Sequence, residues 1–133
     1  MQIEGANGMM VLLALVAGIG IGAVWYAPPV FGNVWQALAG IKPGTKPGIQ
    51  SFAGWAASYL VLVVTLAYLF NHMGVNDPYQ GARWGMTLGL AVVGPATFGS
   101  HLFAKRPFKL FLIDLGNIAI AMGVMGAIIA LGR

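Results

Sequence analysis

Four long apolar segments dominate this sequence, and short breaks rich in proline, glycine and charged residues separate them. The segments cover about residues 9–26, 52–72, 83–103 and 110–131. Each is close to the roughly 20 residues that an α-helix needs to cross a hydrocarbon core about 30 Å thick. Lipid offers the backbone no hydrogen-bond partner, and the alternating pattern of a barrel is missing, so each segment is predicted to be a helix. The predicted fold class is all-α, with residues 1–133 forming a single four-helix transmembrane domain.

The composition agrees with burial in lipid. Hydrophobic residues make up 59% of the 133 residues and charged residues only 8%, against roughly 25% charged in an average soluble domain. The net charge of +4 does not indicate nucleic-acid binding, because five of the seven basic residues lie in two short segments between apolar runs. The chain has no cysteine, which excludes disulfides and thiolate metal sites. The lipid bilayer is therefore the first expected partner.

Two features modify the plain four-helix pattern. The longest connection, residues 28–51, carries apolar residues at helix-like spacing before its repeated Lys-Pro-Gly turns, which predicts a short interfacial helix after the first span. In the third segment, Gly94-Pro95 predicts a kink, because proline removes a backbone donor and clashes with the preceding turn.

The distribution of basic residues predicts an orientation. Five of them lie in the first and third connections, namely Lys42, Lys46, Lys105, Arg106 and Lys109. The opposite side holds only Arg83 and Arg133, beside the acidic Glu4 and Asp77. Cytoplasmic loops carry an excess of lysine and arginine, so these two connections are expected in the cytoplasm and both termini outside. Trp25, Tyr26 and Trp35 are interpreted as members of an interfacial aromatic belt.

Small residues recur at four-residue spacing along the predicted helices. The glycines expected in packing faces are Gly18, Gly22, Gly81, Gly85, Gly89 and Gly123. Glycine at that spacing lets two helix backbones approach closely, which replaces the hydrophobic drive that lipid does not provide. Packing within the chain is the preferred interpretation, and an interface with a second copy or with another membrane subunit is the alternative.

Asp114 is the only acidic residue within an apolar segment. A charge at the centre of a membrane helix costs roughly 2.5–3.5 kcal/mol on insertion scales, so a partner is expected. The candidates are His101, Lys109 and Arg106, with Asn117 expected to complete the hydrogen-bond shell. The preferred role is an ion pair or hydrogen bond that pins the last two helices together. The alternatives are a proton or cation relay through Asp114 and His101, and a contact with lipid or a partner.

The two histidines, His72 and His101, are candidate axial ligands for haem or a chlorophyll-type pigment. They belong to opposite faces of the predicted membrane domain, so they do not share one metal. An interfacial hydrogen-bonding role is preferred for each, and no cofactor or metal site is predicted. The sequence also lacks a phosphate-binding glycine loop, a His-Glu-x-x-His motif and a nucleophile elbow, so enzyme catalysis is not expected and no catalytic residue is assigned.

Two separated blocks of the sequence resemble a known family. The first contains Gly22-Ala23-Val24-Trp25-Tyr26, Pro28, Phe31-Gly32 and Trp35, and the second contains Arg106-Pro107, the run from Leu110 to Gly116 and the run from Met125 to Ile128. Together they are similar to the DUF1761 family of bacterial membrane proteins, whose function is unknown. The resemblance implies a four-helix membrane fold in a bacterial inner membrane and no particular activity. Asn117 departs from the aromatic residue expected soon after the aspartate, and Pro29 lengthens the turn after Tyr26.

Three function classes remain open. The preferred one is a non-catalytic accessory or assembly subunit that packs against a larger membrane complex or against itself. The second is an oligomeric transporter of a small solute, a proton or a cation that uses Asp114. The third is a pigment- or haem-binding subunit of a photosynthetic or respiratory complex, with His72 or His101 as ligand.

Overall fold

The computed structural model describes residues 2–3, 5–42 and 44–133, so Glu4 and Pro43 lie outside the described residues. A small hairpin precedes six α-helices and two π-helical turns. In chain order these are β1 (Gln2–Ile3), β2 (Ala6–Asn7), α1 (Gly8–Trp25), η1 (Pro28–Gly32), α2 (Asn33–Ala39), α3 (Ile49–Met73), α4 (Pro78–Leu88), η2 (Gly89–Val93), α5 (Gly94–Phe103) and α6 (Phe108–Leu131). Strands β1 and β2 pair antiparallel, with Ile3 opposite Ala6.

Four helical stretches are long and apolar enough to cross a membrane, namely α1, α3, the continuous run α4–η2–α5, and α6. The predicted all-α membrane fold is confirmed. All four spans begin earlier than the apolar pattern predicts, and the shift is largest for the spans that start at Ile49 and Pro78. Proline suits the first turn of a helix because its missing N–H has no partner there. At the other end of α3, Gly74 adopts a left-handed φ of 70° and stops the helix.

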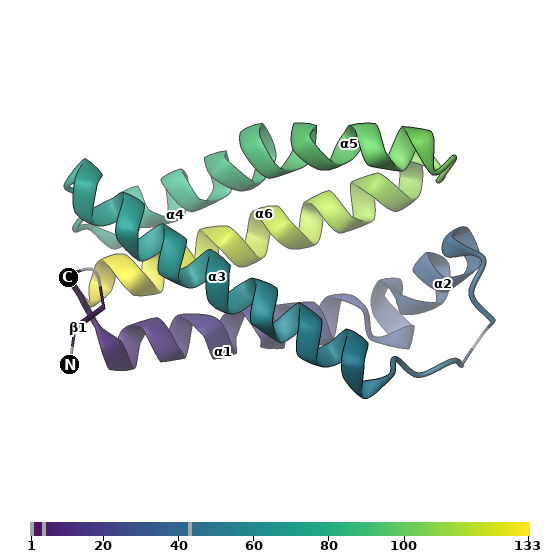
Figure 1. The fold of residues 1–133 in the computed structure, drawn as a ribbon, viewed down its shortest axis with the longest axis horizontal. Helices are drawn as coiled ribbons and strands as arrows, with labels where there is room; N and C mark the ends of the chain where they lie inside the picture. The colour runs from purple at the N-terminus through teal and green to yellow at the C-terminus, as the bar shows by residue number, and fades with distance from the viewer. Residues whose placement is uncertain (1, 4, 43) are drawn as a thin grey trace.

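Helix α6 is the centre of the arrangement. In Figure 1 it lies between α1 and the α4–α5 run, while α3 crosses the other helices. In the most apolar 18-residue stretch of α6, half of the residues are buried inside the protein. In the corresponding stretch of the α4–α5 run, only 11% are buried. The largest fully buried side chains come from α3 and α6: Val63, Leu66, Phe70, Leu110, Met125 and Ile129. The outer faces of the other helices are apolar and exposed, as a lipid-facing surface requires.

Glycines allow the closest contact between α4 and α6. A Cβ atom added to Gly81 would clash with the carbonyl oxygen of Gly126, and one added to Gly85 would clash with that of Met122. Gly89 continues this face, since its Cβ would lie 3.1 Å from the Cα of Ala119. The backbones of the α4–η2 run and of α6 therefore approach closely over two turns, because the glycines carry no side chain at the contact.

The glycines of α1 make room for side chains instead. A Cβ at Gly18 would meet the sulfur of Met125, and one at Gly22 would meet the indole of Trp55. Gly123 differs from the other five, because the nearest atom to its Cβ would be Met86 Cε at an ordinary 3.5 Å.

The two irregular features expected from the sequence have a structural counterpart. The connection after the first span forms η1 and the short helix α2. The kink expected at Gly94-Pro95 corresponds to the π-helical turn η2, which directly precedes it. The hydroxyl of Thr97 donates to the carbonyl oxygens of Val93 and Gly94 at 3.0 and 3.1 Å. In the π-helical turn the backbone pairing shifts by one residue, since the N–H of Gly94 donates to the carbonyl oxygen of Gly89, five residues earlier.

Candidate functional site

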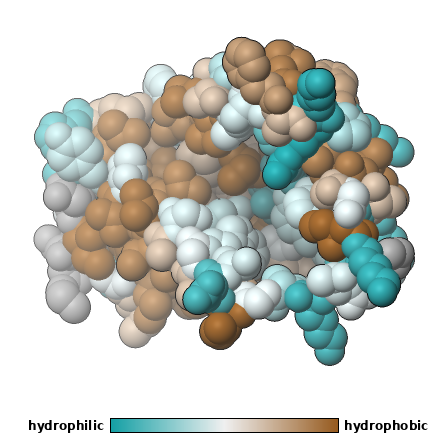
Figure 2. All heavy atoms as spheres, turned by 45° about the vertical axis from the view of Figure 1, so that its right-hand side comes forward, coloured by the Kyte–Doolittle hydropathy of each residue, from teal (hydrophilic) through white to brown (hydrophobic). Residues whose placement is uncertain are grey.

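Asp114 lies near one end of the helical array, where the end of α1, the helix α2 and the end of α5 approach α6 (Figure 1). It follows Phe108, the first residue of α6, by six residues, which corresponds to about 9 Å of helical rise. Figure 2 turns this end toward the viewer, and strongly hydrophilic side chains are scattered over it among hydrophobic ones. The carboxylate thus belongs to a membrane helix but lies close to its polar end.

One carboxylate oxygen of Asp114 is held by two donors from the first part of the chain. The hydroxyl of Tyr26 donates to Oδ1 at 2.6 Å, and the indole N–H of Trp35 donates to the same atom at 2.9 Å. Tyr26 caps the end of α1, and η1 and α2 then return the chain so that the two rings meet edge to face at 5.8 Å. The 2.6 Å distance is typical of an O–H group bound to a charged carboxylate.

Trp25 also links the end of α1 to α6, through residues that directly precede Tyr26 and Asp114. Its indole N–H donates to the carbonyl oxygen of Ile113 at 2.9 Å. The ring lies against Gly116, where a Cβ would come within 2.8 Å of Trp25 Cζ2, and its other neighbour is Phe31 at 4.8 Å. Consecutive residues of the first block therefore bind consecutive residues of α6.

The second carboxylate oxygen faces a histidine. His101 Nε2 lies 3.9 Å from Asp114 Oδ2, which is too long for a direct hydrogen bond. The side chain of Asp114 is 28% exposed and that of His101 only 12%. The other ring nitrogen of His101, Nδ1, is buried and has no hydrogen-bond partner within the described part of the chain. Oδ2 is therefore the less satisfied of the two oxygens.

A pocket of about 200 Å³ opens beside this pair, between α6 and the η2–α5 run. Its lining residues are Val93, Gly94, Thr97, His101, Phe111, Asp114, Leu115 and Ile118. Most of the wall is apolar, and among these lining residues the ionisable side chains are those of Asp114 and His101.

The surroundings of Tyr26 affect its own ionisation. Burial raises the pKa of its phenol above the ordinary value of 10.0, and the hydrogen bond to Asp114 raises the pKa further, since both oppose a second negative charge. The phenol therefore remains a proton donor to Asp114 at neutral pH.

Three residues that were predicted to contact Asp114 do not contact it in the structure. The structure gives it no ion pair with Lys109 or Arg106 among the described residues, and both side chains are exposed. Lys109 precedes Asp114 by five residues, which places it roughly 140° around the helix, and Arg106 lies before α6 begins. Asn117 points to another neighbour, because its amide donates to the hydroxyl of Tyr59 at 3.1 Å.

The sequence did not predict that Tyr26 and Trp35 belong to the site, because both were interpreted as members of an interfacial aromatic belt. Both residues use their polar atom on Asp114 instead. A signal for this was present, because the block containing them and the block containing Asp114 are the two that carry the family resemblance. His72 lies outside the site: it is exposed at the end of α3, with Nδ1 3.0 Å from the carbonyl oxygen of Tyr68.

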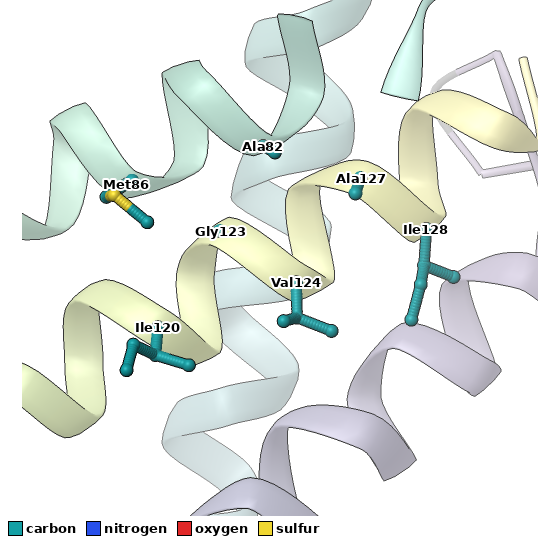
Figure 3. A pocket seen from close by; sticks show the side chains of 7 residues that line it. All are labelled: Ala82, Met86, Ile120, Gly123, Val124, Ala127 and Ile128. Carbon is teal, nitrogen blue, oxygen red and sulfur yellow. The ribbon is translucent and has the colours of Figure 1, made fainter. Parts of the chain in front are cut away.

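No set of three or more histidine, cysteine, aspartate or glutamate side chains lies close enough to hold a metal ion within residues 2–3, 5–42 and 44–133. A second hollow, of about 260 Å³, lies on the flank of the protein between α4 and α6. Figure 3 shows its lining side chains, all of them apolar: Ala82, Met86, Ile120, Gly123, Val124, Ala127 and Ile128. The room left by Gly123 forms part of this groove.

Comparison with known protein families matches most of the chain. Residues 9–130 match the family DUF1761, which is described as a protein of unknown function. No curated protein and no solved structure matches the chain. The matched range includes Tyr26, Trp35, His101 and Asp114.

Proposed function

This chain belongs to the DUF1761 family, and we propose that it is a non-catalytic membrane protein that transports a proton or a small cationic solute, with Asp114 as its binding group. The observation that carries the proposal is the unequal treatment of the two carboxylate oxygens. Oδ1 accepts hydrogen bonds from Tyr26 and Trp35, whereas Oδ2 faces His101 across 3.9 Å at the edge of a pocket.

In a purely structural carboxylate, protein partners on both oxygens would hold the helices together most firmly. An ionisable group inside a membrane helix is costly, and such groups are concentrated on substrate, ion and proton pathways. Here the pinning contacts fix the position of Asp114 and leave one oxygen open to a third group. That combination of a fixed carboxylate and an open acceptor supports a binding role.

The arrangement of helices supports an oligomeric transporter. Helix α5 packs mainly against α6 and η2, and large apolar side chains of its outer face, such as Leu102 and Phe103, are exposed. This face is open to lipid or to a neighbouring copy, and in an oligomer the neighbouring copies would complete the passage. The five basic residues of the first and third connections support a cytoplasmic position for the Asp114 end and a bacterial inner membrane as the location.

Flux into proteoliposomes tests this function. Vesicles containing the purified protein and an internal pH indicator are given a pH gradient and then exposed to Na⁺, K⁺, ammonium, choline or benzylammonium outside. We expect at least one cation to collapse the gradient faster than in protein-free vesicles. The Asp114→Asn variant should fall to the protein-free rate, and Asp77→Asn, which changes the acid before α4, should keep the native rate. Equal rates for native protein and Asp114→Asn would contradict the proposal.

The apolar groove between α4 and α6 favours a second candidate, the accessory or assembly subunit. Its wall includes Gly123 and Ala127, whose small side chains would admit another membrane helix. Purification in mild detergent followed by native mass measurement tests this role. Co-purifying larger subunits that are lost in Gly123→Leu would support it, and an unchanged mass for both proteins would contradict it.

A further inference from the structure

We propose that the pocket beside Asp114 binds a small organic ammonium ion, whose charged nitrogen donates to Asp114 Oδ2 beside His101 and whose apolar group fills the rest. The inference rests on the proposed function and names the class of solute. It starts from the distance between Asp114 Oδ2 and His101 Nε2, 3.9 Å. That distance is too long for a hydrogen bond, so Oδ2 keeps an open acceptor position beside the pocket.

The chemistry of the open oxygen selects the charge of the bound group. Oδ2 of Asp114 is an acceptor, and no donor within the described residues binds it. An ammonium nitrogen supplies N–H donors to Oδ2, whereas an anion would be repelled by the carboxylate and a metal ion lacks a third side-chain ligand among the described residues. The ammonium charge would also compensate the carboxylate, which lowers the cost of burying it.

The chain itself does not supply a strong competing cation. Lys105, Arg106 and Lys109 lie close in sequence to the site, but their side chains are exposed and none forms an ion pair with Asp114 within the described residues. The opposing group is the imidazole of His101. The acidic group that faces a ligand in this pocket is the carboxylate of Asp114.

The size and walls of the pocket select the rest of the ligand. An engineered apolar cavity of about 150 Å³ holds benzene, so the 200 Å³ pocket accommodates a group of that size together with an ammonium nitrogen. Val93, Leu115 and Ile118 provide aliphatic contacts, and Phe111 adds an aromatic ring that meets the imidazole of His101 edge to face at 5.4 Å. A fully polar ion such as Na⁺ leaves this apolar wall unused.

Equilibrium binding to the full chain in mild detergent tests the inference, with benzylammonium as the probe. Benzyl alcohol is the matched neutral compound and benzoate the matched anion. Tryptophan fluorescence reports binding, because the indole of Trp35 is bonded to the other oxygen of Asp114, and calorimetry checks the affinity independently. We expect saturable binding of benzylammonium that is about tenfold or more tighter than that of benzyl alcohol, with no saturable binding of benzoate.

Three variants locate the site. Asp114→Asn should weaken benzylammonium binding about tenfold or more, since it removes the charge partner, and Asp77→Asn should leave binding unchanged. Val93→Phe fills the pocket from η2 without touching the hydrogen bonds of Asp114, so it should weaken binding even where Asp114→Asn fails to fold. Equal affinity for benzylammonium and benzyl alcohol, or native affinity in Val93→Phe, would overturn the inference.

The binding experiment and the transport experiment can fail independently of each other. If Na⁺ collapses the pH gradient through the native protein and benzylammonium does not bind, the solute class is wrong and the transport function stands. If benzylammonium binds through Asp114 and no cation in the panel produces flux, the binding site stands and the transport function is wrong.

Discussion

The hydroxyl of Tyr26 donates a 2.6 Å hydrogen bond to Oδ1 of Asp114, 88 residues later in the chain. One residue earlier on each side, the indole of Trp25 donates to the carbonyl oxygen of Ile113. These contacts join the end of the first span to the beginning of the last. They also fix the carboxylate so that its second oxygen faces His101 and the pocket.

Removing the Tyr26 hydroxyl should weaken this junction. We expect Tyr26→Phe to lower the free energy of unfolding by about 1–2 kcal/mol, because a hydrogen bond to a charged group is lost at a partly exposed position. Denaturant unfolding in detergent, followed by circular dichroism, measures the change. Tyr68→Phe is the control, since Tyr68 is 48% exposed and its hydroxyl has no hydrogen bond within the described residues. Equal effects of the two variants would contradict a role for the Tyr26–Asp114 bond.

The pH dependence of that difference follows from the raised pKa of Tyr26. A group whose pKa is higher in the folded state contributes stability that is fully present below its unfolded value and is lost as the pH rises toward the folded value. The stability difference between native protein and Tyr26→Phe should therefore be constant up to about pH 10, the ordinary tyrosine value, and decrease above it. Thermal melts of both proteins between pH 7 and about pH 11 measure it. A difference that grows above pH 10 would contradict the sign.

Contact between α4 and α6 should tolerate no side chain at Gly85. Gly85→Ala places a Cβ against the carbonyl oxygen of Met122, and overpacking of this kind costs about 1–3 kcal/mol or more because backbone must move. Gly99→Ala is the matched control on the same run of helix, since a Cβ there meets nothing within 4 Å. It should stabilise the protein by roughly 0.5–1 kcal/mol through helix propensity. Denaturant unfolding of both variants compares them, and similar free energies would contradict the packing described.

The Trp25 anchor gives a separate test of the same junction. Trp25→Phe removes the N–H that donates to Ile113 and part of the ring that lies on Gly116, so we expect a loss of about 1–3 kcal/mol. Trp84→Phe changes an indole that is 44% exposed and should cost under about 0.5 kcal/mol. Unfolding monitored by circular dichroism distinguishes them, and an equal or larger effect at Trp84 would be evidence against the anchor.

The spans were predictable because lipid imposes one simple requirement, a run of about 20 apolar residues. The helix ends were less so. The apolar pattern stops at hydrophobic residues, whereas α3 starts three residues earlier than the predicted position 52 and α4 starts at Pro78. Polar and proline residues are compatible with the first turn of a helix, and hydropathy does not register them.

The site was predictable only in part. Asp114 stands out in the sequence because it is the only acid in an apolar span, and His101 follows from folding the last two helices as a hairpin. Tyr26 and Trp35 contact Asp114 only after η1 and α2 reverse the chain, and spacing along the sequence carries no information about that reversal. The predicted pairing of Lys109 with Asp114 failed for a local reason. Five residues along a helix place Lys109 on another face from Asp114.

Flux through paired variants tests the central claim most directly. Proteoliposomes containing the native protein, Asp114→Asn or Asp77→Asn are given a pH gradient, and the panel of cations is added outside. If Asp114 is the binding group, the native protein and Asp77→Asn should collapse the gradient with at least one cation, and Asp114→Asn should fall to the protein-free rate. Equal rates for the native protein and Asp114→Asn would contradict the account.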